Sequence, residues 1–96
     1  LPFPKSSFQG VVVTNYLYRP IFPQLLNLLD DGGILIYETF AVGHEKYGRP
    51  TNPDYLLNSG ELINLVSPQT RIIAYEERLI TRPTKAYVQR IVAEKN

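Results

Sequence analysis

The chain has 96 residues, of which 44% are hydrophobic and 20% charged, and its formal net charge is +1. This length supports one small domain, and the near-neutral charge excludes the basic surface of a nucleic-acid-binding protein. No apolar run approaches the roughly 18–20 residues that a membrane span needs, so we expect a cytoplasmic protein with neither nucleic-acid nor membrane partners. The absence of cysteine excludes disulfides and thiolate chemistry, and a single histidine, His44, argues against a metal centre.

The sequence contains no methionine and begins with Leu1, whereas a translated product begins with methionine. A domain of this size buries only about two thirds of its unfolded surface, and disulfides are not there to reinforce it. We therefore expect a piece of a longer protein, or a domain that is stabilised by packing on a partner.

The first predicted strand carries three consecutive valines, Val11–Val13, which is typical of a strand covered on both faces. The helix that follows begins near Pro20 and Pro23, because the first turn of a helix leaves its N–H groups unpaired. Its apolar stripe has helical spacing and consists of Phe22, Leu25, Leu26 and Leu29. The glycine pair at 32–33 is predicted to end this helix, since glycine accepts the left-handed conformation of a C-cap.

The second strand is predicted over Ile34–Phe40, so that strand, helix and strand form a right-handed βαβ unit with parallel neighbouring strands. The polar carboxyl ends of the two strands, Thr14-Asn15-Tyr16 and Glu38-Thr39-Phe40, should then emerge side by side. Ligands bind beyond the carboxyl ends of strands in such sheets. The connection Ala41–Leu57 is too apolar for a solvated linker, so we expect a packed cover over these strand ends.

The rest of the chain is predicted to hold a short helix and a hairpin. Asn58 suits the N-cap of the helix, with Glu61 three residues on, and Ser67-Pro68 ends it. Strands over Arg71–Ile80 and Lys85–Ala93 form the hairpin. These elements together predict an α/β fold.

Several polar and aromatic side chains at the strand ends are candidate site residues. Asn15 offers an amide and Glu38 a carboxylate, while Tyr16 and Tyr37 offer phenol groups and flat rings. The alternative role for Asn15 is to cap the next helix. Arg19 lies at a helix N-terminus, where the helix dipole disfavours a cation, so it serves either a ligand anion or an acidic side chain elsewhere.

Two groups of residues carry a family resemblance. The first is the strand Phe8–Leu17 with the following Leu-rich helix and the turn and strand Leu29–Phe40. The second comprises Glu38-Thr39-Phe40, Gly43, Glu45, Gly48-Arg49-Pro50, Asn52-Pro53-Asp54 and Leu56-Leu57. With these residues the sequence resembles the second half of a class I S-adenosylmethionine-dependent methyltransferase, in a bacterial subgroup related to the tellurite-resistance methyltransferases.

The resemblance implies a partial doubly wound sheet, in which four strands take the family's order 4-5-7-6 with the last strand antiparallel, and two or three helices. It also implies that the glycine-rich turn and the acidic residue that hold S-adenosylmethionine lie upstream of Leu1. Residues 1–96 would then form a single domain, the C-terminal, substrate-side half of the enzyme, and this fragment alone is expected to be inactive.

For the intact enzyme, the resemblance implies methyl transfer from S-adenosylmethionine to a small acceptor, without a metal. The residues placed in catalysis are Asn15, Glu38 and Tyr37. The residues placed near the cofactor are Thr14, Asn15 and Tyr16. The residues placed near the substrate are Arg19, Phe40, His44, Glu45 and Arg49.

His44 has a second interpretation, because a lone histidine in a loop more often bonds to backbone than takes part in acid–base chemistry. The whole chain has a second interpretation as well. It is an α/β interaction module whose strand at 11–17 pairs with a partner chain or forms a homodimer, since a bare apolar edge strand templates another strand.

Overall fold

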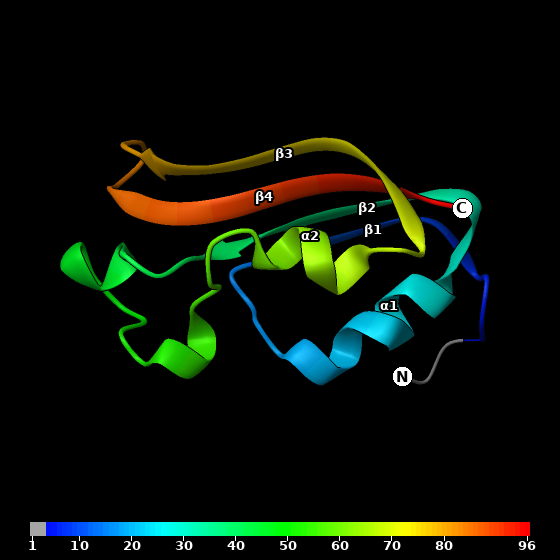
Figure 1. Cartoon of the computed structure of the whole chain (residues 1–96), viewed down its shortest axis with the longest axis horizontal. Helices are drawn as coiled ribbons and strands as arrows, with labels where there is room; N and C mark the ends of the chain where they lie inside the picture. The colour runs from blue at the N-terminus through cyan, green and yellow to red at the C-terminus, as the bar shows by residue number, and fades with distance from the viewer. Residues whose placement is uncertain (1–3) are drawn as a thin grey trace.

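The computed structural model of the chain describes residues 4–96, and residues 1–3 of the predicted domain lie outside this part. Four strands form one mixed sheet in the order β1-β2-β4-β3 (Figure 1). The strands are β1 (Phe8–Thr14), β2 (Leu29–Phe40), β3 (Thr70–Ile80) and β4 (Ala86–Lys95). The predicted fold class and strand order are therefore confirmed.

The strand pairings place β2 and β4 in the middle of the sheet. β1 runs parallel to β2, with Val12 opposite Ile36, as expected for two strands joined by a crossover helix. β4 runs antiparallel to both β2 and β3, with Ile36 opposite Val92. The chain thus inserts its last strand between its second and its third, and β1 and β3 remain the edges of the sheet.

The first helix is shorter than predicted. A 3₁₀ turn at Arg19–Ile21 leads into α1 (Phe22–Leu28), and the next residue, Leu29, is already extended with φ −80° and ψ 139°. The prediction that the glycine pair at 32–33 caps this helix is therefore wrong. Leu29 is buried as expected, but it is buried as the first residue of β2.

The stretch between Leu29 and Ile34 pairs irregularly with β1, because Phe8 lies opposite Leu29 whereas Gly10 lies opposite Ile34. At this register shift Gly32 adopts the left-handed backbone conformation, with φ 79°. A Cβ atom on Gly33 would lie 2.8 Å from the carbonyl oxygen of Asp30. The glycine pair thus serves an irregular strand and not the end of a helix.

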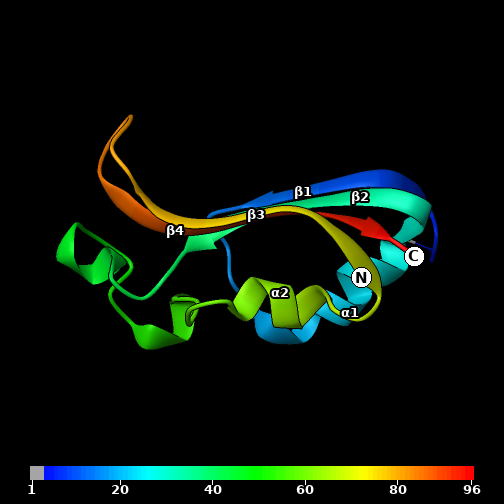
Figure 2. The same ribbon diagram turned by 45° about the horizontal axis from the view of Figure 1, so that its top comes forward.

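Both α-helices cover the same face of the sheet (Figure 2). The second, α2 (Glu61–Val66), ends at Ser67 as predicted, but its N-cap is Gly60 and not Asn58. The carboxylate of Glu61 accepts a hydrogen bond from the backbone N–H of Asn58 at 2.9 Å, which is one half of the predicted capping box. No helix in the described part of the chain is long and apolar enough to cross a membrane.

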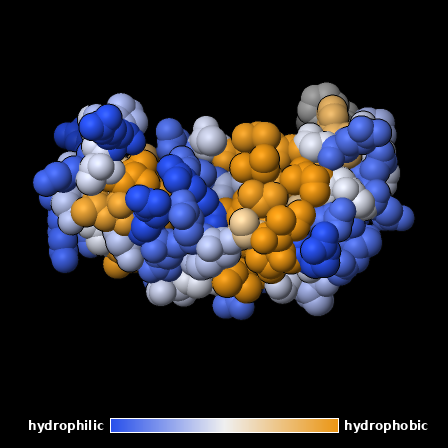
Figure 3. All heavy atoms as spheres, turned by 90° about the horizontal axis from the view of Figure 1, so that it is seen from above, coloured by the Kyte–Doolittle hydropathy of each residue, from blue (hydrophilic) through white to orange (hydrophobic). Residues whose placement is uncertain are grey.

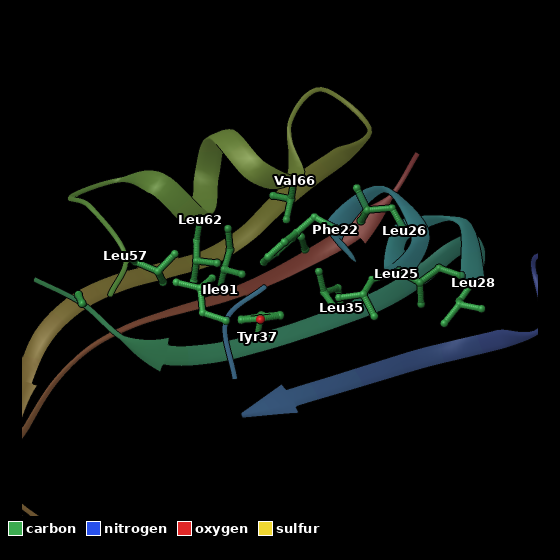
Figure 4. Packing of buried hydrophobic residues seen from close by; sticks show 14 residues of the cluster. Phe22, Leu25, Leu26, Leu28, Leu35, Tyr37, Leu57, Leu62, Val66 and Ile91 are labelled. Atoms are coloured by element: carbon green, nitrogen blue, oxygen red, sulfur yellow. The ribbon is translucent and has the colours of Figure 1, made fainter. Parts of the chain in front are cut away.

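The core lies between this helix layer and the sheet (Figure 4). The ring of Phe22 on α1 packs against the ring of Tyr37 on β2, with 4.7 Å between their centroids. Further members of the same buried cluster are Leu26, Leu35, Leu57, Leu62, Val66 and Ile91. Along β2 the buried residues alternate with less buried ones, which fixes the face that each side chain takes.

The opposite face of the sheet carries no helix among residues 4–96 and is seen in Figure 3 as an apolar band between hydrophilic regions. One row of paired residues crosses all four strands there and consists of Val12, Ile36, Val92 and Ala74. Val12 is 66% exposed and Ile36 is 41% exposed. Parallel strands are normally covered on both faces, so this band is unusual for a β-sheet of this type.

A charged row lies two residues further along the same face. The guanidinium of Arg90 on β4 forms ion pairs with Glu38 on β2 and with Glu76 on β3, the latter at 2.8 Å. Arg90 is opposite both carboxylate residues in the strand register. We call this set, Glu38, Arg90 and Glu76, the Arg90 row.

The connection from Ala41 to Leu57 folds back on the end of β2. Ala41 forms an isolated parallel bridge with Leu57, and two 3₁₀ turns lie between them, at His44–Lys46 and Pro53–Tyr55. Leu56 and Leu57 are buried, as the predicted cover requires. Ala41 and His44 are buried as well, so the connection packs on the sheet near both of its ends.

Candidate functional site

The carboxyl ends of β1 and β2 lie side by side, as predicted. Thr14 is opposite Glu38, and the backbone N–H of Asn15 donates to the carbonyl oxygen of Glu38 at 2.9 Å. Asn15 has φ 56°, in the left-handed region that asparagine tolerates better than most residues. The helical N-caps that follow are Tyr18 and Ile21, neither of which has a side-chain cap bond, so Asn15 caps neither helix.

A cleft of about 280 Å³ opens at these strand ends. Its lining includes Asn15, Tyr16, Thr39, Phe40, Pro50 and Tyr55. Three aromatic rings and an amide thus meet at the point where topology places ligands in α/β sheets. Asn15, Tyr16 and Phe40 were predicted as site residues, whereas Thr39, Pro50 and Tyr55 were not.

Glu38 stands at the same strand end but takes part in the Arg90 row. Because side chains alternate along a strand, Thr39 lies on the helix-covered side and Glu38 on the open side. Its ion pair is the main cause that raises the pKa of Arg90 above its ordinary value, with Glu76 contributing next. The structure thus places the Glu38 carboxylate on the open face, in contact with a cation, and Glu38 is absent from the residues that line the cleft.

Tyr37, also predicted to be catalytic, is fully buried in the core. Its hydroxyl donates a hydrogen bond to the backbone carbonyl of Tyr16. Burial raises its pKa to about 12, so the phenol keeps its proton at neutral pH. The observed role of Tyr37 is to fix the backbone of Tyr16, whose own ring is 51% exposed.

Arg19 pairs with an acidic side chain, which is the second of its two expected roles. Its guanidinium contacts both carboxylate oxygens of Glu61, with Nη2 to Oε1 at 2.9 Å. It also donates to the carbonyl oxygens of Asp54 at 3.0 Å and Leu56 at 2.9 Å. These contacts fasten the turn before α1 to the start of α2 and to the end of the connection that carries Tyr55.

His44 is buried and both of its ring nitrogens face backbone atoms. Nδ1 accepts from the backbone N–H of Tyr87 at 3.2 Å, so Nε2 is the nitrogen that donates to the carbonyl oxygen of Arg49, at 2.9 Å. The ring stacks on Phe40 with 4.2 Å between centroids. This is the backbone-bonded alternative of the sequence analysis, and it leaves neither ring nitrogen free in this structure.

Glu45 and Arg49, both predicted near the substrate, lie on the exposed part of the same turn. The carboxylate of Glu45 accepts from the backbone N–H of Gly43 at 2.7 Å. Within residues 4–96, no group of three His, Asp or Glu side chains is arranged to hold a metal ion.

No family model matches the sequence, and no curated protein matches it. Solved structures do match. An S-adenosylmethionine-dependent methyltransferase from Methanosarcina mazei superimposes with a TM-score of 0.75 at 17% identity, over 99% of this chain and 62% of that one. TehB from Haemophilus influenzae superimposes with a TM-score of 0.73 at 13% identity, over 96% of this chain and 37% of that one. The chain has the fold of part of a methyltransferase.

The chain spans about half the length of the solved structures that it matches. The same fold also occurs in the [4+2]-cyclase SpnF, with a TM-score of 0.70 at 14% identity, over 99% of this chain and 52% of that one. The fold that the sequence predicts is therefore confirmed, while the reaction has to be argued from the site.

Proposed function

We propose that this chain is the substrate-side part of an S-adenosylmethionine-dependent methyltransferase that acts on a small acceptor. The observation that carries the proposal is the cleft at the carboxyl ends of β1 and β2. Its size suits a small molecule, and aromatic walls with one amide can hold and orient an acceptor without a metal. Catalysis in such an enzyme consists largely of aligning a nucleophile with the methyl group.

Thr14, Asn15 and Tyr16 fit the cofactor by the chemistry of their side chains. A hydroxyl, an amide and an exposed aromatic ring bind neutral and cationic groups without adding a charge of their own. When bound, S-adenosylmethionine supplies an electrophilic methyl group on its sulfonium sulfur. Asn15, which reaches the cleft from a strained backbone, is the residue that we assign to orient the acceptor against that group.

The other predicted residues support this site in the proposal. Tyr37 holds the Tyr16 carbonyl, and Arg19 holds the Leu56 carbonyl next to Tyr55. Glu38 precedes the cleft residue Thr39 in the strand, and its carboxylate is paired with Arg90 on the open face of the sheet. We assign Tyr37 and Arg19 as positioning residues. The remaining fold, including the parts that bind the adenosine and ribose of the cofactor, belongs in this proposal to a polypeptide outside residues 1–96.

The test measures methyl transfer from labelled S-adenosylmethionine to a panel of small acceptors by the full-length protein that contains this chain. Asn15→Ala should lower turnover about 100-fold. It should also lower the free energy of unfolding by about 1 kcal/mol, because alanine tolerates the left-handed backbone less well than asparagine, so turnover is compared where both proteins are folded. Asn64→Ala is the matched control, since Asn64 is an exposed amide on α2, and should leave turnover unchanged. Unchanged turnover in Asn15→Ala would refute the assigned site, and failure to transfer methyl to any acceptor would refute the reaction.

A specific observation favours the second candidate function, an interaction module that pairs through its first strand. β1 is an edge of the sheet, and Val12 on it is 66% exposed. An edge of β-branched residues with free N–H and C=O groups templates another strand, and the occupant that we propose is a second copy of this chain.

Sedimentation of the 96-residue chain tests this pairing. The chain should sediment as a dimer at high concentration, and Val12→Lys should make it monomeric, because a charged edge residue opposes strand addition. Ile73→Lys is the control, since Ile73 is 47% exposed on the opposite edge strand, β3, and should leave the dimer intact. A clean monomer of the unmodified chain at high concentration would rule out this pairing between copies of the chain.

A further inference from the structure

A second hollow, of about 520 Å³, lies beside the strand-end cleft. Its walls come from the end of β2, from the turn at 44–49 and from the residues that open β4, which lie close together at one end of the molecule in Figure 1. The two hollows share only Phe40. The second is therefore a separate site whose occupancy does not depend on the proposed methyl transfer.

Three cationic side chains line this hollow: Lys46, Arg49 and Lys85. None of the three has an ion pair in the described part of the chain, and no carboxylate is among the residues that line the hollow. Four other arginines do pair with carboxylates, namely Arg19, Arg71, Arg78 and Arg90. Lys5, Arg82 and Lys95 also have no ion pair in the described part of the chain, but only in this hollow do three unpaired cations line one cavity.

The cations are carried on a framework that the buried His44 holds together. His44 joins the carbonyl of Arg49 to the backbone N–H of Tyr87, so the turn is fastened to the start of β4 two residues beyond Lys85. The backbone positions of the three cations are therefore fixed relative to one another, which lowers the entropic cost of gathering them around one ligand group.

We propose that this hollow binds the oxyanion group of a small molecule, either a phosphate or a carboxylate. The planar guanidinium of Arg49 matches two oxygens of such a group, and Lys46 and Lys85 add point charges. The rings of Phe40 and Tyr47 offer an apolar wall to the carbon part of the ligand. The volume is that of a small-molecule site, and a net charge of +1 does not suit a polyanion such as a nucleic acid.

The test is an NMR titration of the uniformly ¹⁵N-labelled chain with inorganic phosphate, with acetate and with sodium chloride at matched ionic strength. Saturable shifts are expected for the amides of residues 44–49 and 85–87. Arg49→Gln and Lys46→Gln should each raise the dissociation constant about tenfold, which is the loss expected for one charge-assisted contact. Lys5→Gln is the matched control, because Lys5 is exposed and absent from the hollow.

The arms of the titration separate the sources of the oxyanion. Binding of phosphate alone indicates that the ligand carries a phosphoryl group, and binding of acetate alone indicates a carboxylate. Binding of both anions indicates that the hollow accepts either group. The proposal is overturned if neither anion saturates, if chloride produces the same shifts, or if Lys5→Gln weakens binding as much as Arg49→Gln. Because no methyl donor is present, failure here leaves the proposed methyl transfer untouched, and success does not establish it.

Discussion

Replacing Arg19 by methionine should lower the free energy of unfolding by about 2 kcal/mol, because methionine keeps much of the apolar stem but removes four hydrogen bonds. A hydrogen bond to a charged group is worth about 1.5–3 kcal/mol, whereas a fully exposed ion pair is worth about 0–1 kcal/mol. The Arg19 side chain is 33% exposed and that of Glu61 17%, so this pair lies between the two limits.

The matched control is Arg71→Met. Arg71 also pairs with a carboxylate, that of Glu94, but their side chains are 65% and 35% exposed. Its loss should therefore cost less than about 0.5 kcal/mol. Urea denaturation at pH 7 measures the free energy of unfolding of each variant. The slope of this free energy against urea concentration should be the same in both variants. Equal costs for the two variants would refute the argument that burial strengthens the Arg19 pair.

The same pair predicts a dependence on pH. The hydrogen bond from Arg19 is the main cause that holds the pKa of Glu61 below its ordinary value of 4.5. A carboxyl whose pKa is lower in the folded state stabilises the fold at pH above its unfolded value, and this stabilisation is lost as the pH falls through the lowered folded value. The difference in stability between the unmodified chain and Arg19→Met should therefore be full at pH 7 and shrink in acid.

Gly33→Ala should destabilise the chain by about 1–3 kcal/mol, because its Cβ would lie 2.8 Å from a backbone oxygen, whereas Gly48→Ala, with nothing within 4 Å, should leave the melting temperature nearly unchanged. Equal melting temperatures would contradict the close approach at Gly33. Calorimetry on the 96-residue chain should detect no micromolar binding of S-adenosylmethionine, since the turn and the acidic residue that hold the cofactor in the proposal lie outside residues 1–96. Such binding would show that the cofactor site is misplaced.

The four strands could be predicted because each carries its own local signal, and the crossover rule then orients β1 and β2. The place of the last strand between the second and the third was implied by the family resemblance and not by these signals. The end of α1 could not be predicted in the same way. A glycine pair suits a helix C-cap and an irregular strand equally well, and the choice is made by Phe8, which pairs with Leu29 from a distant part of the chain. Tertiary pairing therefore overrides the local helical pattern.

The part of the candidate site that lies at the strand ends could be predicted from the order and direction of the strands. Asn15, Tyr16 and Phe40 meet in the cleft because parallel strands end at one edge. The two-residue period of a strand was the available signal that Tyr37 and Glu38 take opposite faces. The partners of Arg19 lie 35 to 42 residues away in the sequence, so no local pattern could identify them.

The Arg90 row also determines which alignment of the last strand is stable. β4 is the final strand in the chain, and it has to enter between two strands that precede it. If it slipped by one residue, every side chain would change face, and the Arg90 guanidinium would point among the buried leucines, away from both Glu38 and Glu76. An unpaired buried charge costs several kcal/mol, so misaligned sheets are penalised and a single register is selected.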